Sequence, residues 1–150
     1  MKKLLNVYQS ANSIDVALLI TRVGVAALML VHGWPKLEML FSDGPVQFPA
    51  VLGLSATTSL ALAVFSEVLC SLLILVGLGT RLATIPLIVT MVVAVFIFHA
   101  ADPFAKQELG LLYLMPYTVL LLTGSGRYSL DYLLLQKVFK PTYVRTLSIQ

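Results

Sequence analysis

Four long apolar segments constrain the fold of this chain more than any other feature of its sequence. The predicted spans cover residues 14–34, 57–79, 82–100 and 109–124, and the last of them is the shortest. A helix needs about 20 such residues to cross roughly 30 Å of hydrocarbon. An open sheet cannot satisfy its backbone hydrogen bonds in lipid, so the segments predict helices rather than strands.

The composition supports lipid as the solvent of these helices. The 150 residues are 59% hydrophobic and 11% charged, whereas a soluble domain carries about 25% charged residues. We therefore expect one membrane domain over residues 1–150, an all-α integral membrane four-helix bundle. The net charge of +3 comes from scattered basic residues and gives no indication of nucleic-acid binding. The single cysteine, Cys70, excludes an internal disulfide and a thiolate metal cluster.

Basic residues near the ends of the spans predict the orientation of the chain. Because Lys and Arg favour the cytoplasmic side, we expect a multi-pass protein of the inner (plasma) membrane with both termini in the cytoplasm. Residues 127–141 mix apolar and basic side chains, which predicts a C-terminal amphipathic interfacial helix, with a frayed tail as the alternative. The predicted inner set is Lys2, Lys3, Arg81, Arg127, Lys137, Lys140 and Arg145, and the outer set is Lys36 and Lys106.

Two ionisable residues lie deep within the predicted spans, where such side chains usually face the bundle interior. Counted from the same membrane surface, Arg22 lies about 12 Å deep and Glu67 about 18 Å deep, so their long side chains could meet. One interpretation is a charged or proton-exchanging site. The other is a structural Arg22–Glu67 ion pair, or a protonated Glu67, that fixes the helix register. Arg127 and Asp131 are four residues apart and form a second candidate ion pair if their segment is helical.

The stretch LMLVHGWPKLEML, residues 28–40, predicts the outer end of the first span, because Pro35 should end or bend that helix. The third span should end on the same side. We therefore expect one polar layer there, either a pocket mouth or simply wetted helix ends. Its ionisable groups come from separate helices and have no fixed ligand spacing, so no metal site is predicted. The predicted layer contains His32, Lys36, His99, Asp102 and Glu108, and the nearby rings of Trp34, Tyr113 and Tyr117 either stack on a ring-shaped ligand or anchor the core.

The order of several short motifs resembles that of the DoxX family of small bacterial and archaeal membrane proteins. The motifs are TRVGVAALMLVHGWPKL, SEVLCSLLILVGLGTRLA, HAADPF and ELGLLYLMPYTVLLLTGSGRYSLD, and they run from Arg22 to Asp131. The chain departs from the family pattern by a longer, Pro-containing outer loop. The family takes its name from a subunit of a thiosulfate:quinone oxidoreductase, so the resemblance implies an association with redox chemistry. The positions that would carry a quinone link are Arg22, His32, Lys36, Glu67, His99 and Glu108.

Two functions follow as hypotheses. The first is a redox-associated membrane subunit, a candidate oxidoreductase component, that binds a quinone or another lipid-like molecule within the bundle. No cofactor is self-evident from the sequence, so electrons would come from a redox partner protein. The second is a non-catalytic lipid-binding protein or an assembly and scaffold factor. Small residues on the first two spans would also suit a homo-oligomer.

Overall fold

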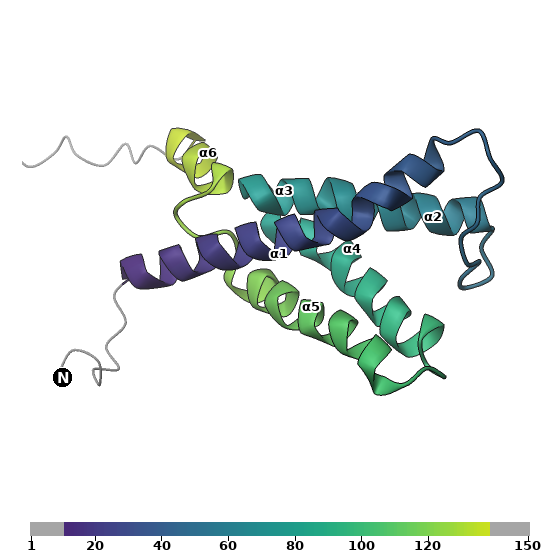
Figure 1. Ribbon diagram of the computed structural model, residues 1–150. Coiled ribbons are helices and arrows are strands. Elements are labelled where there is room, and N and C mark those ends of the chain that lie inside the picture. The colour runs from purple at the N-terminus through teal and green to yellow at the C-terminus, as the bar shows by residue number, and fades with distance from the viewer. Residues whose placement is uncertain (1–10, 139–150) are drawn as a thin grey trace, which may run out of the picture.

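The computed structural model describes residues 11–138, and within them the chain contains helices and no strand (Figure 1). The segments α2, η1 and α3 form one continuous helix, and α4 continues into η2; both η segments are π-helical. Together with α1 and α5 they give a bundle of four long helices, which confirms the predicted all-α membrane fold. The elements are α1 Ala11–Leu40, α2 Ala56–Val64, η1 Phe65–Cys70, α3 Ser71–Val76, α4 Thr80–Val93, η2 Ala94–Phe98, α5 Phe104–Thr123 and α6 Leu130–Val138.

Three of the long helices are apolar and long enough to cross a membrane, namely Ala11–Leu40, Ala56–Val76 and Thr80–Phe98. The chain is therefore a multi-pass membrane protein. The fourth predicted span corresponds to α5, a 20-residue helix that packs along α4. It is long enough to cross a membrane but less apolar than the other three helices, because its first turns contain polar residues, Lys106 and Glu108 among them.

The sequence predicted that Pro35 ends or bends the first helix, and the structure shows that the helix does not end there. It continues through that proline to Leu40. A proline inside a helix loses one backbone hydrogen bond. Around it, the indole Nε1 of Trp34 donates to Oε1 of Glu38 at 2.8 Å, which links the two sides of the proline turn. The added turns carry Lys36 along the neighbouring helix instead of into a surface loop.

The bundle has two ends, which we name by one residue each. The Gly77 end contains the tight turn between α3 and α4, the loop 124–129, the start of α1, and α6 (Figure 1). Gly77 ends α3 in the left-handed conformation with φ +74°, which glycine adopts without strain. The Lys36 end contains the loop 41–55 and the turn between η2 and α5. The predicted C-terminal helix is present as α6, and residues 139–141 of its predicted range lie outside the described residues.

An apolar interior separates the two ends. Its fully buried members come from four helices and include Ala26, Ile74, Leu87, Tyr117 and Leu120. Large apolar side chains cover the outside of the same helices, as expected for a surface that faces lipid.

Candidate functional site

Two cavities meet at the Lys36 end, and Lys36, Glu67, Ala94 and His99 line both of them. The larger cavity, of about 330 Å³, lies between the loop 41–55, the α2–η1 helix and the α4–η2 helix. The smaller cavity, of about 200 Å³, lies between α1, the α4–η2 helix and α5. The apolar lining of the larger cavity includes Phe48, Leu52, Leu62, Val89, Val93 and Phe98, and the smaller is lined in addition by Met29, His32, Met91, Lys106 and Tyr113.

An ion pair between Lys36 and Glu67 forms the wall that the cavities share. The ammonium Nζ of Lys36 donates to Oε1 of Glu67, whose side chain is 3% exposed. The second carboxylate oxygen, Oε2, is buried and has no hydrogen-bond partner within the described chain. The Lys36 ammonium also lies 5.8 Å from the ring centroid of Phe48, at the outer limit of a cation–π contact. Glu67 therefore keeps one oxygen for a ligand or a water.

Both π-helical segments border this site. Glu67 lies inside η1, and His99 directly follows η2, with its backbone N–H donating to the Ala94 carbonyl at 2.9 Å. Gly33 of α1 packs against η1 so closely that an added Cβ would lie 3.1 Å from the Glu67 backbone carbon and 3.1 Å from its Cβ. Short π-helical segments are rare and are frequent at functional sites.

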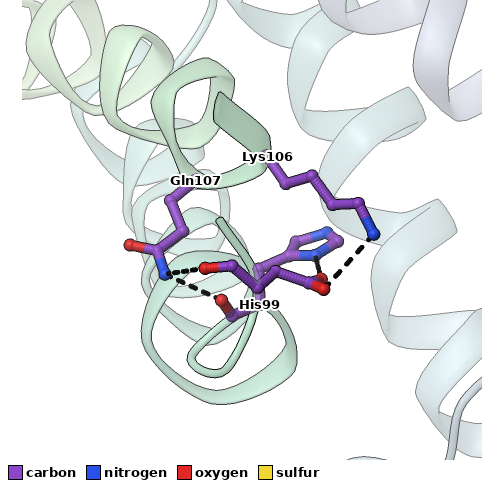
Figure 2. Close-up of polar contacts among 4 residues, drawn as sticks. His99, Lys106 and Gln107 are labelled. Atoms are coloured by element: carbon purple, nitrogen blue, oxygen red, sulfur yellow. Dashed lines mark hydrogen bonds and ion pairs between the residues drawn. The ribbon is translucent and has the colours of Figure 1, made fainter. Parts of the chain in front are cut away.

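His99 is held by a hydrogen-bonded group at the mouth of the cavities (Figure 2). Its Nδ1 lies 2.7 Å from Oδ2 of Asp102, and Lys106 Nζ donates to Oδ1 of Asp102 at 3.2 Å. The amide of Gln107 donates to the backbone carbonyl of His99 at 2.8 Å. The hydrogen bond from His99, and then that from Lys106, hold the pKa of Asp102 below its usual value. Because an ionised carboxylate only accepts, Nδ1 carries the hydrogen and Nε2 is available to a ligand.

Three rings connect the smaller cavity with the bundle core. His32 meets Tyr113 edge to face, with centroids 5.9 Å apart, and Tyr113 stacks on Tyr117 at 6.0 Å and an angle of 17°. Tyr117 is 0% exposed, and its hydroxyl has no partner among the described residues. These tyrosines are core residues, and Tyr113 also reaches a cavity.

The structure brings together four of the six ligand-binding candidates. His32, Lys36, Glu67 and His99 all line the smaller cavity. Glu108 is exposed and belongs to the lining of neither cavity, because it lies on another face of α5 than Gly110 and Tyr113.

Arg22, the sixth candidate, lies at the Gly77 end and does not pair with Glu67. Its guanidinium is buried, donates to the backbone carbonyl of Tyr128, and packs so tightly on Gly77 that no Cβ fits there. The antiparallel register explains the error in the predicted pair. Gly33 faces Glu67 and Arg22 faces Gly77, so the two charges are separated by about ten helical residues, or roughly 15 Å.

The predicted Arg127–Asp131 pair is also replaced by other contacts. Asp131 caps the start of α4, where its Oδ1 accepts from the backbone N–H of Gly79 at 2.8 Å. Arg127 instead joins Asp15 of α1, with its Nε 3.4 Å from Oδ2 and its backbone N–H 3.0 Å from Oδ1. The segment between Arg127 and Asp131 becomes helical only at Leu130, so the i, i+4 geometry that the pair required is missing.

Sequence reasoning missed one contributor to the site, Phe48, which reaches the cavity from the loop 41–55. It placed Asp102 in the polar layer but not as the residue that orients His99. Asp102 lies three residues after His99 in HAADPF, and that spacing on a turn was a usable signal. The loop gave no comparable pattern, because its placement depends on tertiary packing.

Comparisons with known proteins agree with this architecture. The sequence pattern of the DoxX family matches residues 17–100. A Haemophilus influenzae protein named "Uncharacterized protein" is 32% identical over 117 residues, which cover 73% of this chain and 84% of the relative. A Bacillus subtilis protein named "Putative oxidoreductase CatD" is 28% identical over 120 residues, which cover 79% of this chain and 87% of the relative. No solved structure matches the chain.

Proposed function

This chain belongs to the DoxX family, and on that premise we propose that it is a redox-associated membrane subunit that binds a quinone, or a similar ring-headed lipid, in the larger cavity. The observation that carries the proposal is the partly satisfied Glu67 carboxylate in the cavity wall, beside Lys36 and His99. The name of the Bacillus subtilis relative supports the redox part.

The size and lining of the larger cavity fit such a ligand. Its volume of about 330 Å³ lies at the lower end of the range of about 300–1,000 Å³ for small-molecule sites. Several apolar lining residues, Leu62, Val89 and Phe98 among them, are also about half exposed on the outside of the bundle. A lipid-soluble ring could therefore enter from the hydrocarbon and leave its tail there.

Two side chains would hold the ring, and Glu67 would position one of them. A quinone supplies reversible acceptance of two electrons and two protons. Lys36 would donate hydrogen bonds to a ring oxygen. Nε2 of His99, whose Nδ1 donates to Asp102, would accept the hydrogen bond of a ring hydroxyl in the reduced quinol. Glu67 keeps Lys36 in place through Oε1. Electrons come from a partner protein, because the chain contains one cysteine and no recognisable haem or flavin motif.

The distribution of basic residues supports an orientation. The Lys36 end faces the outside of the inner (plasma) membrane and the Gly77 end faces the cytoplasm, as the distribution of basic residues predicts. Fusion of reporter proteins to the C-terminus and to the loop 41–55 tests this arrangement.

A quinone titration tests the binding proposal. We expect decylubiquinone or a short-tailed menaquinone to raise the melting temperature of the protein in nanodiscs and to quench its one tryptophan. Lys36→Met should weaken binding of the quinone at least tenfold, and His99→Ala should weaken binding of the reduced quinol at least tenfold. Glu108→Gln is the matched control, because that exposed residue lies outside both cavities. Equal binding by the wild type and the three variants would contradict the proposal.

A non-catalytic lipid-binding function is the second candidate. It is favoured by the internal neutralisation of the site, since Lys36 pairs with Glu67 and Lys106 with Asp102. Such a cavity would hold an uncharged lipid without any chemistry. Extraction of bound lipids from gently purified protein distinguishes the two, because a quinone lost in Lys36→Met supports the first and a bulk lipid retained in all variants supports the second.

A further inference from the structure

A third cavity lies at the Gly77 end, at the opposite end of the bundle from the proposed quinone site. Its volume is about 530 Å³, and it lies between the first turn of α4, the end of α5 with the loop 124–126, and α6. It shares no lining residue with the two cavities at the Lys36 end. Its volume is within the range of about 300–1,000 Å³ for small-molecule sites. The cavity is therefore a candidate binding site of its own.

Exposed leucines border this cavity on two sides. Leu82 of α4 is 75% exposed, and Leu134 and Leu135 of α6 are 50% and 55% exposed. All residues from 133 to 137 of α6 are exposed, so this part of the helix does not close the space. An apolar edge on a membrane protein is a surface that hydrocarbon covers.

Arg81 is the cation of this cavity, and no carboxylate within residues 11–138 forms an ion pair with it. Its Nη2 donates to the Leu122 carbonyl at 3.0 Å and, at 3.5 Å, to the Thr123 carbonyl. The N–H groups of Nε and Nη1 form no hydrogen bond with the described chain. A guanidinium with unused N–H groups binds phosphate oxygens in a two-pronged geometry. Arg81 therefore offers a site for an anionic group.

The carboxylate of Asp131 also lines the cavity, but it already accepts hydrogen bonds on both oxygens. Its Oδ1 caps α4, and its Oδ2 accepts from the Ser125 hydroxyl at 3.2 Å and from the backbone N–H of Thr80 at 3.4 Å. The backbone N–H of Asp131 donates to the Gly77 carbonyl at 2.9 Å, and the buried guanidinium of Arg22 packs on the same glycine. The negative charge of Asp131 thus serves the helix start and lies beside a buried cation.

The Gly77 end as a whole carries an excess of positive charge. Arg127 is paired with Asp15, which neutralises both. Basic pockets beside membrane helices bind anionic lipid headgroups. A soluble phosphate would use the cation alone, whereas the exposed leucines of this cavity also suit an acyl chain. The described ionisable residues of this end are the basic Arg22, Arg81, Arg127 and Lys137 and the acidic Asp15 and Asp131.

We propose that the cavity at the Gly77 end binds one anionic phospholipid, with the phosphate group on Arg81 and the start of an acyl chain along Leu82, Leu134 and Leu135. The lipid fills the space between α6 and the ends of α4 and α5. This site is independent of the proposed quinone site, because the cavities have no residue in common.

Native mass spectrometry of the full chain in detergent tests the site by counting bound lipids during a titration. We expect the wild type to bind one phosphatidylglycerol more tightly than phosphatidylethanolamine. Arg81→Gln should weaken that binding about tenfold, the effect of one lost hydrogen bond to a charged group. Arg127→Gln is the matched control, because it removes the same charge from an exposed arginine outside the cavity. Equal affinities in the three proteins, or an equal loss in both variants, would overturn the site.

A second pair of variants tests the acyl-chain contact and decides the matter if Arg81→Gln does not fold. Leu82→Gln should weaken the binding of phosphatidylglycerol, whereas Leu122→Gln should not, because Leu122 is 72% exposed on α5 and lies outside the cavity. Equal binding by these two variants would overturn the acyl-chain contact. Displacement of the lipid by inorganic phosphate would assign the site to a soluble anion, and equal affinity for phosphatidylethanolamine would overturn the preference for an anionic lipid.

Discussion

Lys36 and Glu67 form an ion pair between α1 and η1, 31 positions apart in the sequence, and only one of the two carboxylate oxygens is used. The pair joins the loop-bearing end of α1 to a π-helical turn in the wall of two cavities. Its position makes it both a structural contact and the polar centre of the proposed ligand site.

Breaking one half of this pair should destabilise the protein more than removing both halves. Lys36→Met leaves a buried carboxylate without its cation, and we expect a loss of about 2–3 kcal/mol in the free energy of unfolding, below the 3–5 kcal/mol of fully buried pairs. Adding Glu67→Gln to Lys36→Met should restore most of that loss. Chemical or thermal unfolding, monitored by circular dichroism, measures the stability of the single and the double variant.

Lys106→Met is the matched control for this cycle, because Lys106 is 62% exposed and pairs with Asp102 at the surface. Exposed pairs contribute about 0–1 kcal/mol. A double variant that is less stable than Lys36→Met alone would contradict the assigned pairing.

Gly33 should be intolerant of any side chain. An added Cβ would lie 2.8 Å from Val68 Cγ2 and 3.1 Å from the Glu67 backbone, so Gly33→Ala must push α1 away from η1. We expect a loss of about 1–3 kcal/mol, the usual cost of overpacking, and weaker quinone binding because Lys36 moves with α1. Gly24→Ala on the same helix is the control, since nothing lies within 4 Å of its Cβ position. Equal melting temperatures for the two variants would show that the helices are not in this contact.

The sequence predicted the helices well, because their apolar length depends on composition alone. Their relative depth was predicted poorly. The pairing of Arg22 with Glu67 assumed that the start of the first span and the end of the second lie at the same level, whereas the close contact of Gly33 with η1 sets the actual register. A glycine that admits a neighbouring helix has no distinctive pattern in one sequence.

The candidate site was predicted only in part, again because the relative depth of the helices was not known from the sequence. His32, Lys36 and His99 were placed in one layer because the first and third spans were predicted to end on the same side of the membrane, and these residues share a cavity. Glu67 joined them because Gly33 packs against η1, and it pairs with Lys36 because α1 continues past Pro35. The sequence signal for a helix end at proline is general, and here the tertiary contacts overrode it.

Asp131 should stabilise the Gly77 end without influencing the ligand site. Its carboxylate accepts from the backbone N–H of Gly79 at 2.8 Å and from Ser125 Oγ at 3.2 Å, and so caps the start of α4. Asp131→Ala should lower the free energy of unfolding by about 1–2 kcal/mol, as for other lost caps. Asp43→Ala, at an exposed loop position, should leave stability nearly unchanged. A change in quinone affinity in Asp131→Ala, measured on the folded protein, would argue that the two ends are coupled.

Acidification should protonate Asp102 and so weaken its hydrogen bonds to His99 and Lys106 at the mouth of the site. Hydrogen bonds from His99 and Lys106 hold the pKa of Asp102 below the ordinary value of 3.8, so its ionised form is favoured in the folded protein. A lowered pKa in the folded state contributes stability above the unfolded value and loses it as the pH falls through the folded value. The wild type should therefore melt above Asp102→Asn by a constant difference from about pH 7 to pH 5, and the two should converge below about pH 4. Comparing the two proteins at each pH cancels the titration of the other carboxyl groups, and a difference that persists or widens in acid would show that Asp102 is not held ionised by His99 and Lys106.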